Sequence, residues 1–208
     1  GVREIHTPPQ SFLRAQLDAV FDDVAVDAVK IGMLGDTETT HTVADYLAVR
    51  PVPVVVVDPV MVATSGDRML SADAEAALRQ LVADHATVVT PNIPELAVLT
   101  DEPEPDSFDA AVELGQRYAR EADVQVLVKG GHLSGERASN ALVAPDGTTH
   151  VAEVARVATK NTHGTGCSLS SALATRMALG SATAAVTWAS EWLHEAIAHA
   201  DELNVGRG

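Results

Sequence analysis

Aromatic and basic residues are scarce in this 208-residue chain. Phe, Trp and Tyr make up 3% of it although 46% of the residues are hydrophobic. The interior must therefore be built from Val, Leu, Ala and Ile, a composition that suits parallel strands covered by helices. Lys and Arg number 14 against 29 Asp and Glu, and the formal net charge is −15. This deficit of positive charge argues against nucleic acid or an anionic membrane as a partner, because phosphate backbones are bound by excess Lys and Arg.

Cysteines and long apolar runs are also lacking. The single cysteine, Cys167, cannot form an internal disulfide, so nothing points to an oxidising compartment. The first nine residues have no basic region followed by an apolar one, and no segment is a continuous apolar span of membrane length. We therefore predict a soluble, cytoplasmic protein, with residues 1–208 forming a single domain.

Predicted strands and helices alternate along most of the chain. Four consecutive valines at 54–57 cannot alternate between a buried and an exposed face, so this strand is expected to be buried on both faces, as in a parallel sheet. Further strands are predicted at 26–32, 87–90 and 124–128, a hairpin at 141–151, and helices at 7–23, 38–49, 71–83, 108–121, 166–179 and 182–203. This order predicts an α/β fold with a doubly wound, mainly parallel sheet and helices on both faces.

A glycine-rich loop precedes one of the two C-terminal helices. Gly164 and Gly166 flank Thr165, Cys167 follows at once, and small and apolar residues then recur at helical spacing. The first N–H groups of such a helix attract an anion such as a phosphate. A thiolate is favoured at this position, so Cys167 is a candidate base for a substrate hydroxyl. On local sequence alone, a simple turn and a buried, inert cysteine are an equally good interpretation.

Polar residues also gather where four of the predicted strands end. They lie in the segments 30–34, 58–61, 90–95 and 129–132, which meet at one edge of a parallel sheet, where α/β proteins bind ligands. Taken singly, Asp58 before Pro59 suits a turn, and Asn92 with Glu95 suits a helix capping box. Lys129 is harder to explain as structural, because an unpaired buried lysine is costly and a neighbouring phosphate would remove that cost.

Five motifs together resemble the hydroxymethylpyrimidine/phosphomethylpyrimidine kinases of thiamin biosynthesis, which belong to the ribokinase superfamily. The motifs span residues 29–34, 57–66, 90–95, 128–133 and 160–167. The resemblance covers nearly the whole chain and is most specific at 160–167, because relatives that phosphorylate sugars usually carry Asp where this sequence has Cys167. It implies a ribokinase-like fold and Mg²⁺- and ATP-dependent phosphorylation of 4-amino-5-hydroxymethyl-2-methylpyrimidine, and then of its monophosphate.

The resemblance also implies a role for each matching residue. Cys167 would be the base, and the backbone around it would hold the transferring phosphoryl group. The catalytic residues implied are Cys167, Gly164, Thr165 and Gly166. Those implied for the substrate are Met33, Val60 and Gly32, of which Met33 and Val60 would pack on the pyrimidine ring. Those implied for the nucleotide are Lys129, Asn92 and Lys160, and those for the metal are Glu95 and Asp58.

The chain departs from the family at both ends. The family begins with a strand, a glycine-rich turn containing Asp, and a second strand ending near a glutamine that recognises the pyrimidine, and none of these precedes Gly1. Its usual tail is also missing after Gly208. The sequence therefore predicts an incomplete substrate pocket and a fragment that folds poorly alone. Two alternatives stay open: a pyridoxine or pyridoxal kinase of the same fold, and a non-catalytic module that binds the pyrimidine or mediates dimerisation. The expected partners are the pyrimidine and ATP, with a homodimer as a further candidate.

Overall fold

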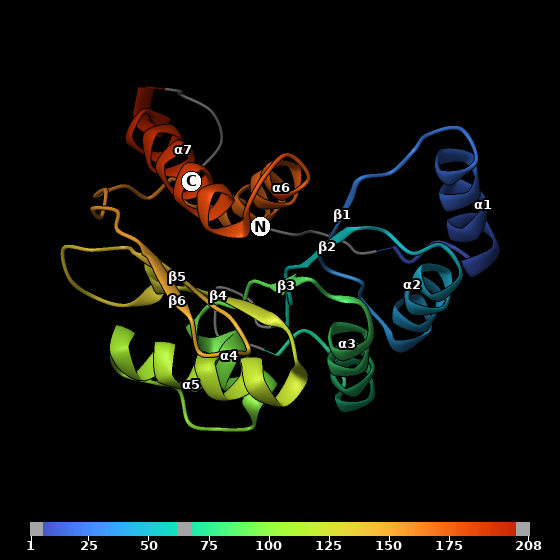
Figure 1. The fold of residues 1–208 in the computed structure, drawn as a ribbon, viewed down its shortest axis with the longest axis horizontal. Helices are drawn as coiled ribbons and strands as arrows, with labels where there is room; N and C mark the ends of the chain where they lie inside the picture. The colour runs from blue at the N-terminus through green and yellow to red at the C-terminus, as the bar shows by residue number, and fades with distance from the viewer. Residues whose placement is uncertain (1–5, 62–67, 203–208) are drawn as a thin grey trace.

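A six-stranded sheet forms the centre of the computed structural model, which describes residues 6–61 and 68–202 (Figure 1). The strands follow one another in chain order across the sheet. The first four are parallel, and the last two form an antiparallel hairpin against the fourth. They are β1 (Ala28–Ile31), β2 (Val54–Val57), β3 (Val88–Val89), β4 (Gln125–Lys129), β5 (Asn140–Val143) and β6 (Thr149–Ala152). The prediction of a mainly parallel sheet is confirmed.

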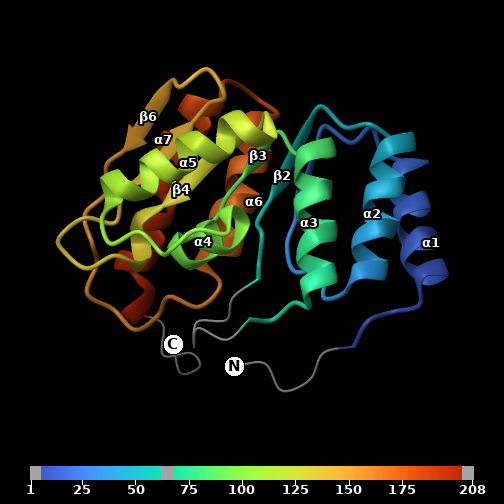
Figure 2. The ribbon, with the colours of Figure 1, turned by 90° about the horizontal axis from the view of Figure 1, so that it is seen from below.

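Helices cover both faces of the sheet, as predicted (Figures 1 and 2). One face carries α2 (Thr37–Val49), α3 (Ala72–His85), α4 (Ile93–Thr100) and α5 (Phe108–Ala122), and the other carries α6 (Thr165–Met177) and α7 (Ala182–Ala198). Right-handed crossovers between strands in chain order place every intervening helix on the same face. The order of the described strands never reverses, so no helix that connects two parallel strands reaches the second face. That face is covered by α6 and α7, which follow the hairpin.

The remaining helices lie outside these two layers. Helix α1 (Gln10–Phe21) packs beside α2. There the rings of Phe21 and Tyr46 pack edge to face, with 5.2 Å between their centroids. Two short 3₁₀ turns follow β4 and α7, at Gly130–His132 and Ala200–Glu202. No helix in the described residues is both long and apolar enough to cross a membrane.

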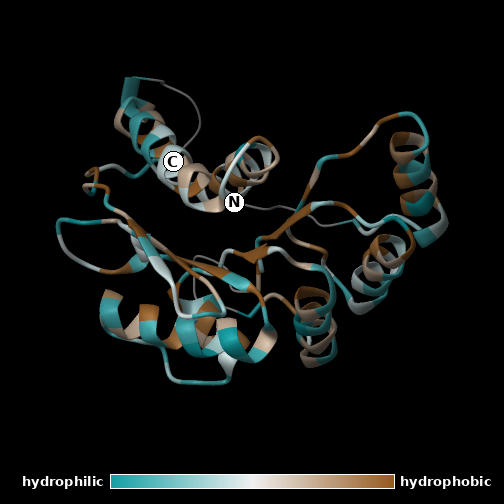
Figure 3. Ribbon diagram, in the orientation of Figure 1, coloured by the Kyte–Doolittle hydropathy of each residue, from teal (hydrophilic) through white to brown (hydrophobic). Residues whose placement is uncertain are grey.

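The strands divide the core into two apolar layers by simple alternation. Val55 and Val57 face the α2–α5 layer, whereas Val54 and Val56 face α6 and α7. All four are buried, which confirms the prediction from the run of valines. Strands β2 and β3, which consist of valines, are accordingly coloured as hydrophobic in Figure 3. Because neighbouring residues point to opposite faces, the positions that follow each strand inherit the same alternation.

Several boundaries differ from the prediction. Helix α4 is absent from the predicted helices, because Pro91 and Pro94 indicate the end of a strand, although the capping-box interpretation of Asn92 and Glu95 implies a helix start at this point. Pro94 in fact occupies the first turn of α4, where no N–H is needed within the helix. Strand β3 is two residues long instead of four. Residues 62–66 of the second motif, and the predicted last residue of the C-terminal helix, lie outside the described part of the chain.

Candidate active site

The alternation of the strands aims four polar side chains at the start of α6. Each lies two residues beyond a position of the layer that packs against α6 and α7, so each points to that same face. These pairs are Ala28 and Lys30, Val56 and Asp58, Val88 and Thr90, and Leu127 and Lys129. The ladder continues past the strands, since the Asp58 and Thr90 N–H groups donate to the carbonyls of Ile31 and Val57. The four polar side chains therefore continue the rows of residues that face α6 and α7, just beyond the apolar core.

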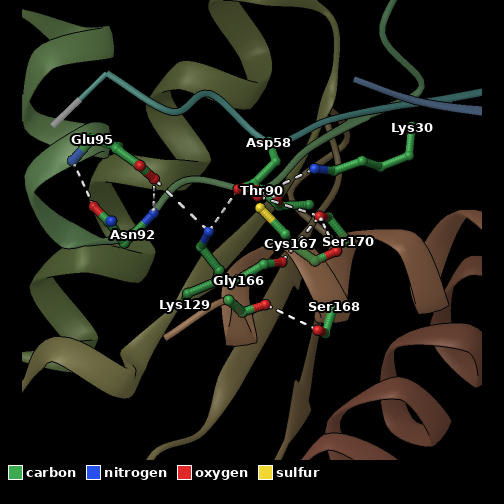
Figure 4. Close-up of polar contacts among 11 residues, drawn as sticks. Lys30, Asp58, Thr90, Asn92, Glu95, Lys129, Gly166, Cys167, Ser168 and Ser170 are labelled. Carbon is green, nitrogen blue, oxygen red and sulfur yellow. Dashed lines mark hydrogen bonds and ion pairs between the residues drawn. The ribbon is translucent and has the colours of Figure 1, made fainter. Parts of the chain in front are cut away.

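Asp58 is the centre of this group (Figure 4). It is 2% exposed, and a buried carboxylate is tolerated only when it is paired. Its Oδ1 accepts hydrogen bonds from Lys129 Nζ at 2.9 Å and from Thr90 Oγ1 at 3.2 Å. Its Oδ2 accepts one from Ser170 Oγ at 3.3 Å and lies 3.8 Å from Lys30 Nζ. Asp58 thus does more than form a turn, because it joins β1, β4 and α6.

Asn92 and Glu95 form the capping box that starts α4. The Asn92 side chain accepts from the Glu95 N–H at 2.9 Å, and Glu95 Oε2 accepts from the Asn92 N–H at 2.8 Å. The same Oε2 is 3.8 Å from Lys129 Nζ. Burial, with a smaller contribution from the negative charge of Asp58, raises the pKa of Glu95 to about 7, although Lys129 and the Asn92 N–H oppose the shift. Capping is confirmed, and the carboxylate also faces the ion pair.

The start of α6 lies directly against the ion pair. Gly164 is the N-cap residue, with φ +80°, and as a glycine it has no side chain with which to cap the helix. A Cβ atom on Gly166 would lie 3.5 Å from Lys129 Nζ and 3.8 Å from Asp58 Oδ2, so the bare backbone is what faces these charges. Cys167 comes next and is exposed. The interpretation of this cysteine as a buried core residue is therefore wrong.

The residues expected to bind the pyrimidine follow β1 and β2. Met33 is 41% exposed, while Gly32 and Val60 are half-buried. The Val60 N–H donates to the Asp58 carbonyl at 2.8 Å, which keeps this loop next to the charged group. Lys160 is exposed, and within residues 6–61 and 68–202 no hydrogen bond or ion pair joins it to the group around Asp58. Its role stays a prediction.

Three partners of the site were missed from the sequence: Lys30 as a partner of Asp58, and the hydroxyls of Thr90 and Ser170. The signal for Lys30 and Thr90 is the spacing of two residues from an inward-facing apolar position. Ser170 lies four residues after Gly166, on the same side of α6. Its Oγ lies 3.0 Å from the Gly166 carbonyl and 3.3 Å from Asp58 Oδ2, so its one proton is shared between acceptors at the helix start and the carboxylate.

The carboxylates fit a magnesium ion that arrives with phosphates. Among the described residues there is no group of three or more His, Cys, Asp or Glu able to hold a metal alone. Mg²⁺ is commonly bound through one or two carboxylates, with phosphate oxygens and water completing its shell. Asp58 and Glu95 supply two such carboxylates, on either side of Lys129 Nζ. The donor set thus suits a nucleotide-bound ion better than a protein-only cage.

Comparison with known proteins gives a consistent assignment. The chain is 55% identical over 209 residues to the thiamine biosynthesis multifunctional protein ThiED of Corynebacterium efficiens, covering all of this chain but only 28% of that protein. It is 41% identical over 209 residues to the hydroxymethylpyrimidine/phosphomethylpyrimidine kinase of Escherichia coli, covering 100% of this chain and 78% of that one. The chain thus spans under a third of the first relative's length.

A solved structure matches as well. It is an ADP complex of Bacillus subtilis pyridoxal kinase, with a TM-score of 0.80 and 30% identity over 89% of this chain and 69% of that chain. The match confirms the predicted ribokinase-like fold. The family model for phosphomethylpyrimidine kinase matches residues 1–208. With the buried charged group at the strand ends and the glycine-rich start of α6 in place, the chain belongs to the phosphomethylpyrimidine kinase family.

Proposed function

We propose that this protein transfers the γ-phosphoryl group of ATP to the hydroxymethyl group of 4-amino-5-hydroxymethyl-2-methylpyrimidine, and then a second phosphoryl group to the resulting monophosphate. The observation that carries this proposal is the contact between the start of α6 and the Asp58–Lys129 ion pair, with exposed Cys167 next in the chain. The name of the Escherichia coli relative supports the same two substrates.

Lys129 and the backbone of α6 would bind the nucleotide phosphates. The Lys129 side chain is 12% exposed, and its ammonium lies 2.9 Å from Asp58 and 3.8 Å from Glu95, next to the backbone of Gly166. The ADP complex of the pyridoxal kinase supports a nucleotide in this fold. Mg²⁺ would neutralise charge on the phosphates, and Asp58 and Glu95 would hold it. The N–H groups at the helix start would stabilise the phosphoryl group in transfer. We also propose that the exposed Lys160 contacts the nucleotide.

The two steps place different demands on Cys167. In the first, the substrate hydroxyl oxygen attacks the γ-phosphorus, its proton passes to Cys167 Sγ, and the bond from phosphorus to the ADP oxygen breaks. In the second, a phosphate oxygen of the monophosphate attacks. A phosphate monoester is largely ionised near neutral pH, since its second pKa is about 6. No proton then has to be removed, so the base is needed chiefly in the first step.

Turnover of the purified full-length protein with Mg²⁺ and ATP tests the proposal. We expect ADP release with both pyrimidines and a diphosphate as the final product, identified by mass. Pyridoxal is the matched competitor, because the Bacillus subtilis protein of similar structure is named a pyridoxal kinase. A kcat/KM for pyridoxal above that for the pyrimidine would assign the chain to the alternative. No ADP release with any of these alcohols would favour a non-catalytic module.

The location and assembly belong to the same proposal. We place the protein in the cytoplasm, where ATP and biosynthetic intermediates are available, and we propose a homodimer. Light scattering coupled to size-exclusion chromatography tests the assembly, since a mass of one chain at micromolar concentration contradicts it. Fractionation of cells with an antibody against the protein tests the location.

A further inference from the structure

A second ammonium group, that of Lys30, lies beside Asp58 and has no part in the proposed nucleotide site. Lys30 is in β1, in register with Val56 of β2. Its Nζ is 3.8 Å from Asp58 Oδ2, whereas Lys129 Nζ is 2.9 Å from Oδ1. The two lysines approach the carboxylate from opposite sides, Lys30 from β1 and Lys129 from β4 (Figure 4). One carboxylate therefore serves two cations on two sides of the site.

The Lys30 ammonium lies near Asp58 and keeps donors for a ligand. Its side chain is 18% exposed, so it is neither fully buried nor free in solvent. In the described part of the chain it makes no hydrogen bond to another side chain, and its distance of 3.8 Å from Asp58 marks an ion pair rather than a hydrogen bond. An ammonium group carries three N–H donors. A bound anion would use them.

Gly32 shows where this ammonium points. A Cβ atom on Gly32 would lie 2.7 Å from Lys30 Nζ, closer than real Cβ atoms approach their neighbours, so the ammonium lies against the backbone of Gly32. Gly32 and Met33 belong to the loop that we expect to contact the pyrimidine ring. The Lys30 ammonium thus connects the expected pyrimidine loop with Asp58.

The two proposed substrates differ by one phosphate group. The hydroxymethyl pyrimidine carries no charge there, whereas a phosphate monoester carries about −1.5 to −2 near pH 7. That phosphate must approach Asp58 from the pyrimidine side, where the carboxylate would repel it unless a cation intervenes. We propose that Lys30 binds the phosphate of the pyrimidine monophosphate and so adapts the site to the second phosphorylation. This inference rests on the proposed function, since it names the substrate group that Lys30 contacts.

Variants at Lys30 test the proposal by separating the two steps. In Lys30→Met, we expect kcat/KM for the monophosphate to fall roughly 10- to 100-fold further than kcat/KM for the hydroxymethyl pyrimidine, mainly through KM, as for the loss of one charge-assisted hydrogen bond. Lys30→Arg should recover part of the second step. Lys129→Met is the matched control, because it removes a charge from the other side of Asp58 and should lower both steps by similar factors.

Direct binding separates this inference from the proposed function. Calorimetric titration of the monophosphate into nucleotide-free protein should give weaker affinity in Lys30→Met than in wild type, even if wild type turns over neither pyrimidine; that absence of turnover contradicts the proposed function alone. Equal affinities, or no binding to wild type, overturn the role of Lys30. Equal losses at both kinetic steps also overturn it, because they assign Lys30 to positioning Asp58. Lys30→Gln replaces Lys30→Met if the latter fails to fold.

Discussion

The Lys129 ammonium donates to Asp58 Oδ1 at 2.9 Å although the two residues are 71 positions apart in the chain. The contact forms only when β2, β3 and β4 are in register, so the charged group depends on the assembled sheet. Asp58 is nearly inaccessible and Lys129 is largely buried. Charges in such an environment are costly when unpaired, so each partner stabilises the other.

A double-mutant cycle measures this dependence. Lys129→Met should lower the free energy of unfolding by about 2–4 kcal/mol, because it leaves the buried Asp58 carboxylate with fewer partners. Asp58→Asn should have a similar effect by leaving Lys129 opposite a neutral group. The double variant should lose less than the sum of the singles, measured by urea titration of each protein. Strict additivity would mean that the two charges are independently solvated.

Cys167→Ser should separate the two phosphorylations. A hydroxyl releases its proton far less readily than a thiol, so the first step should slow by roughly 10²- to 10⁴-fold, the usual scale for loss of a general base. The second step should slow much less, because the attacking phosphate has no proton to lose. Rapid-quench assays with each pyrimidine measure both rates.

The neighbouring variant Ser171→Ala is the control for this experiment, since Ser171 is an exposed residue of the same helix. Cys167→Asp should retain part of the first step, because a carboxylate can accept the same proton. If Cys167→Ser turns over the hydroxymethyl pyrimidine like wild type, the thiol is not the base. Proton removal would then belong to water or to the nucleotide phosphate.

The sequence placed Asp58, Glu95 and Lys129 near one edge of the sheet because the segments 58–61, 90–95 and 129–132 follow predicted strands, and the family resemblance implied their roles. The ends of parallel strands meet at one edge whatever their register. The partners of Asp58 could not be derived in the same way. Which side chain meets which depends on the register of four strands, and that register is set by packing between segments far apart in the chain. The capping box indicated a possible start of α4, but the helix itself was not predicted, because proline is compatible both with a strand end and with the first turn of a helix.

Glu95 should make the stability of the metal-free protein depend on pH. Its pKa is raised from 4.5 to about 7 on folding, so between these values the folded state binds more protons than the unfolded chain. Stability must then fall as pH rises through this window, by on the order of 2–3 kcal/mol from this one group. Glu95→Gln keeps the capping box and should remove that part of the slope. Urea titrations at pH 5 and pH 8 in EDTA provide the measurement.

The exposed Glu113→Gln variant controls for the loss of one negative charge. Addition of Mg²⁺ with a nucleotide should make the change in stability between pH 5 and pH 8 more similar in wild type and Glu95→Gln. A nearby cation favours the ionised carboxylate and so lowers the pKa of Glu95 in the folded state. If Glu95→Gln shows the same change in stability between the two pH values as wild type, burial does not control the proton on Glu95.

Gly166→Ala should damage nucleotide binding without damaging the fold. The added Cβ would lie 3.5 Å from Lys129 Nζ and 3.8 Å from Asp58 Oδ2, which are ordinary contact distances, and alanine is the better helix former by about 1 kcal/mol. The melting temperature should therefore stay the same or rise. The methyl group would nevertheless occupy the space where a phosphate approaches the backbone, so kcat/KM for ATP should fall at least about tenfold.

Gly164→Ala is the contrasting variant. At φ +80° any residue with a side chain is strained, so this substitution should lower stability. A stable Gly166→Ala protein with unchanged ATP kinetics would show that phosphates do not bind at the start of α6.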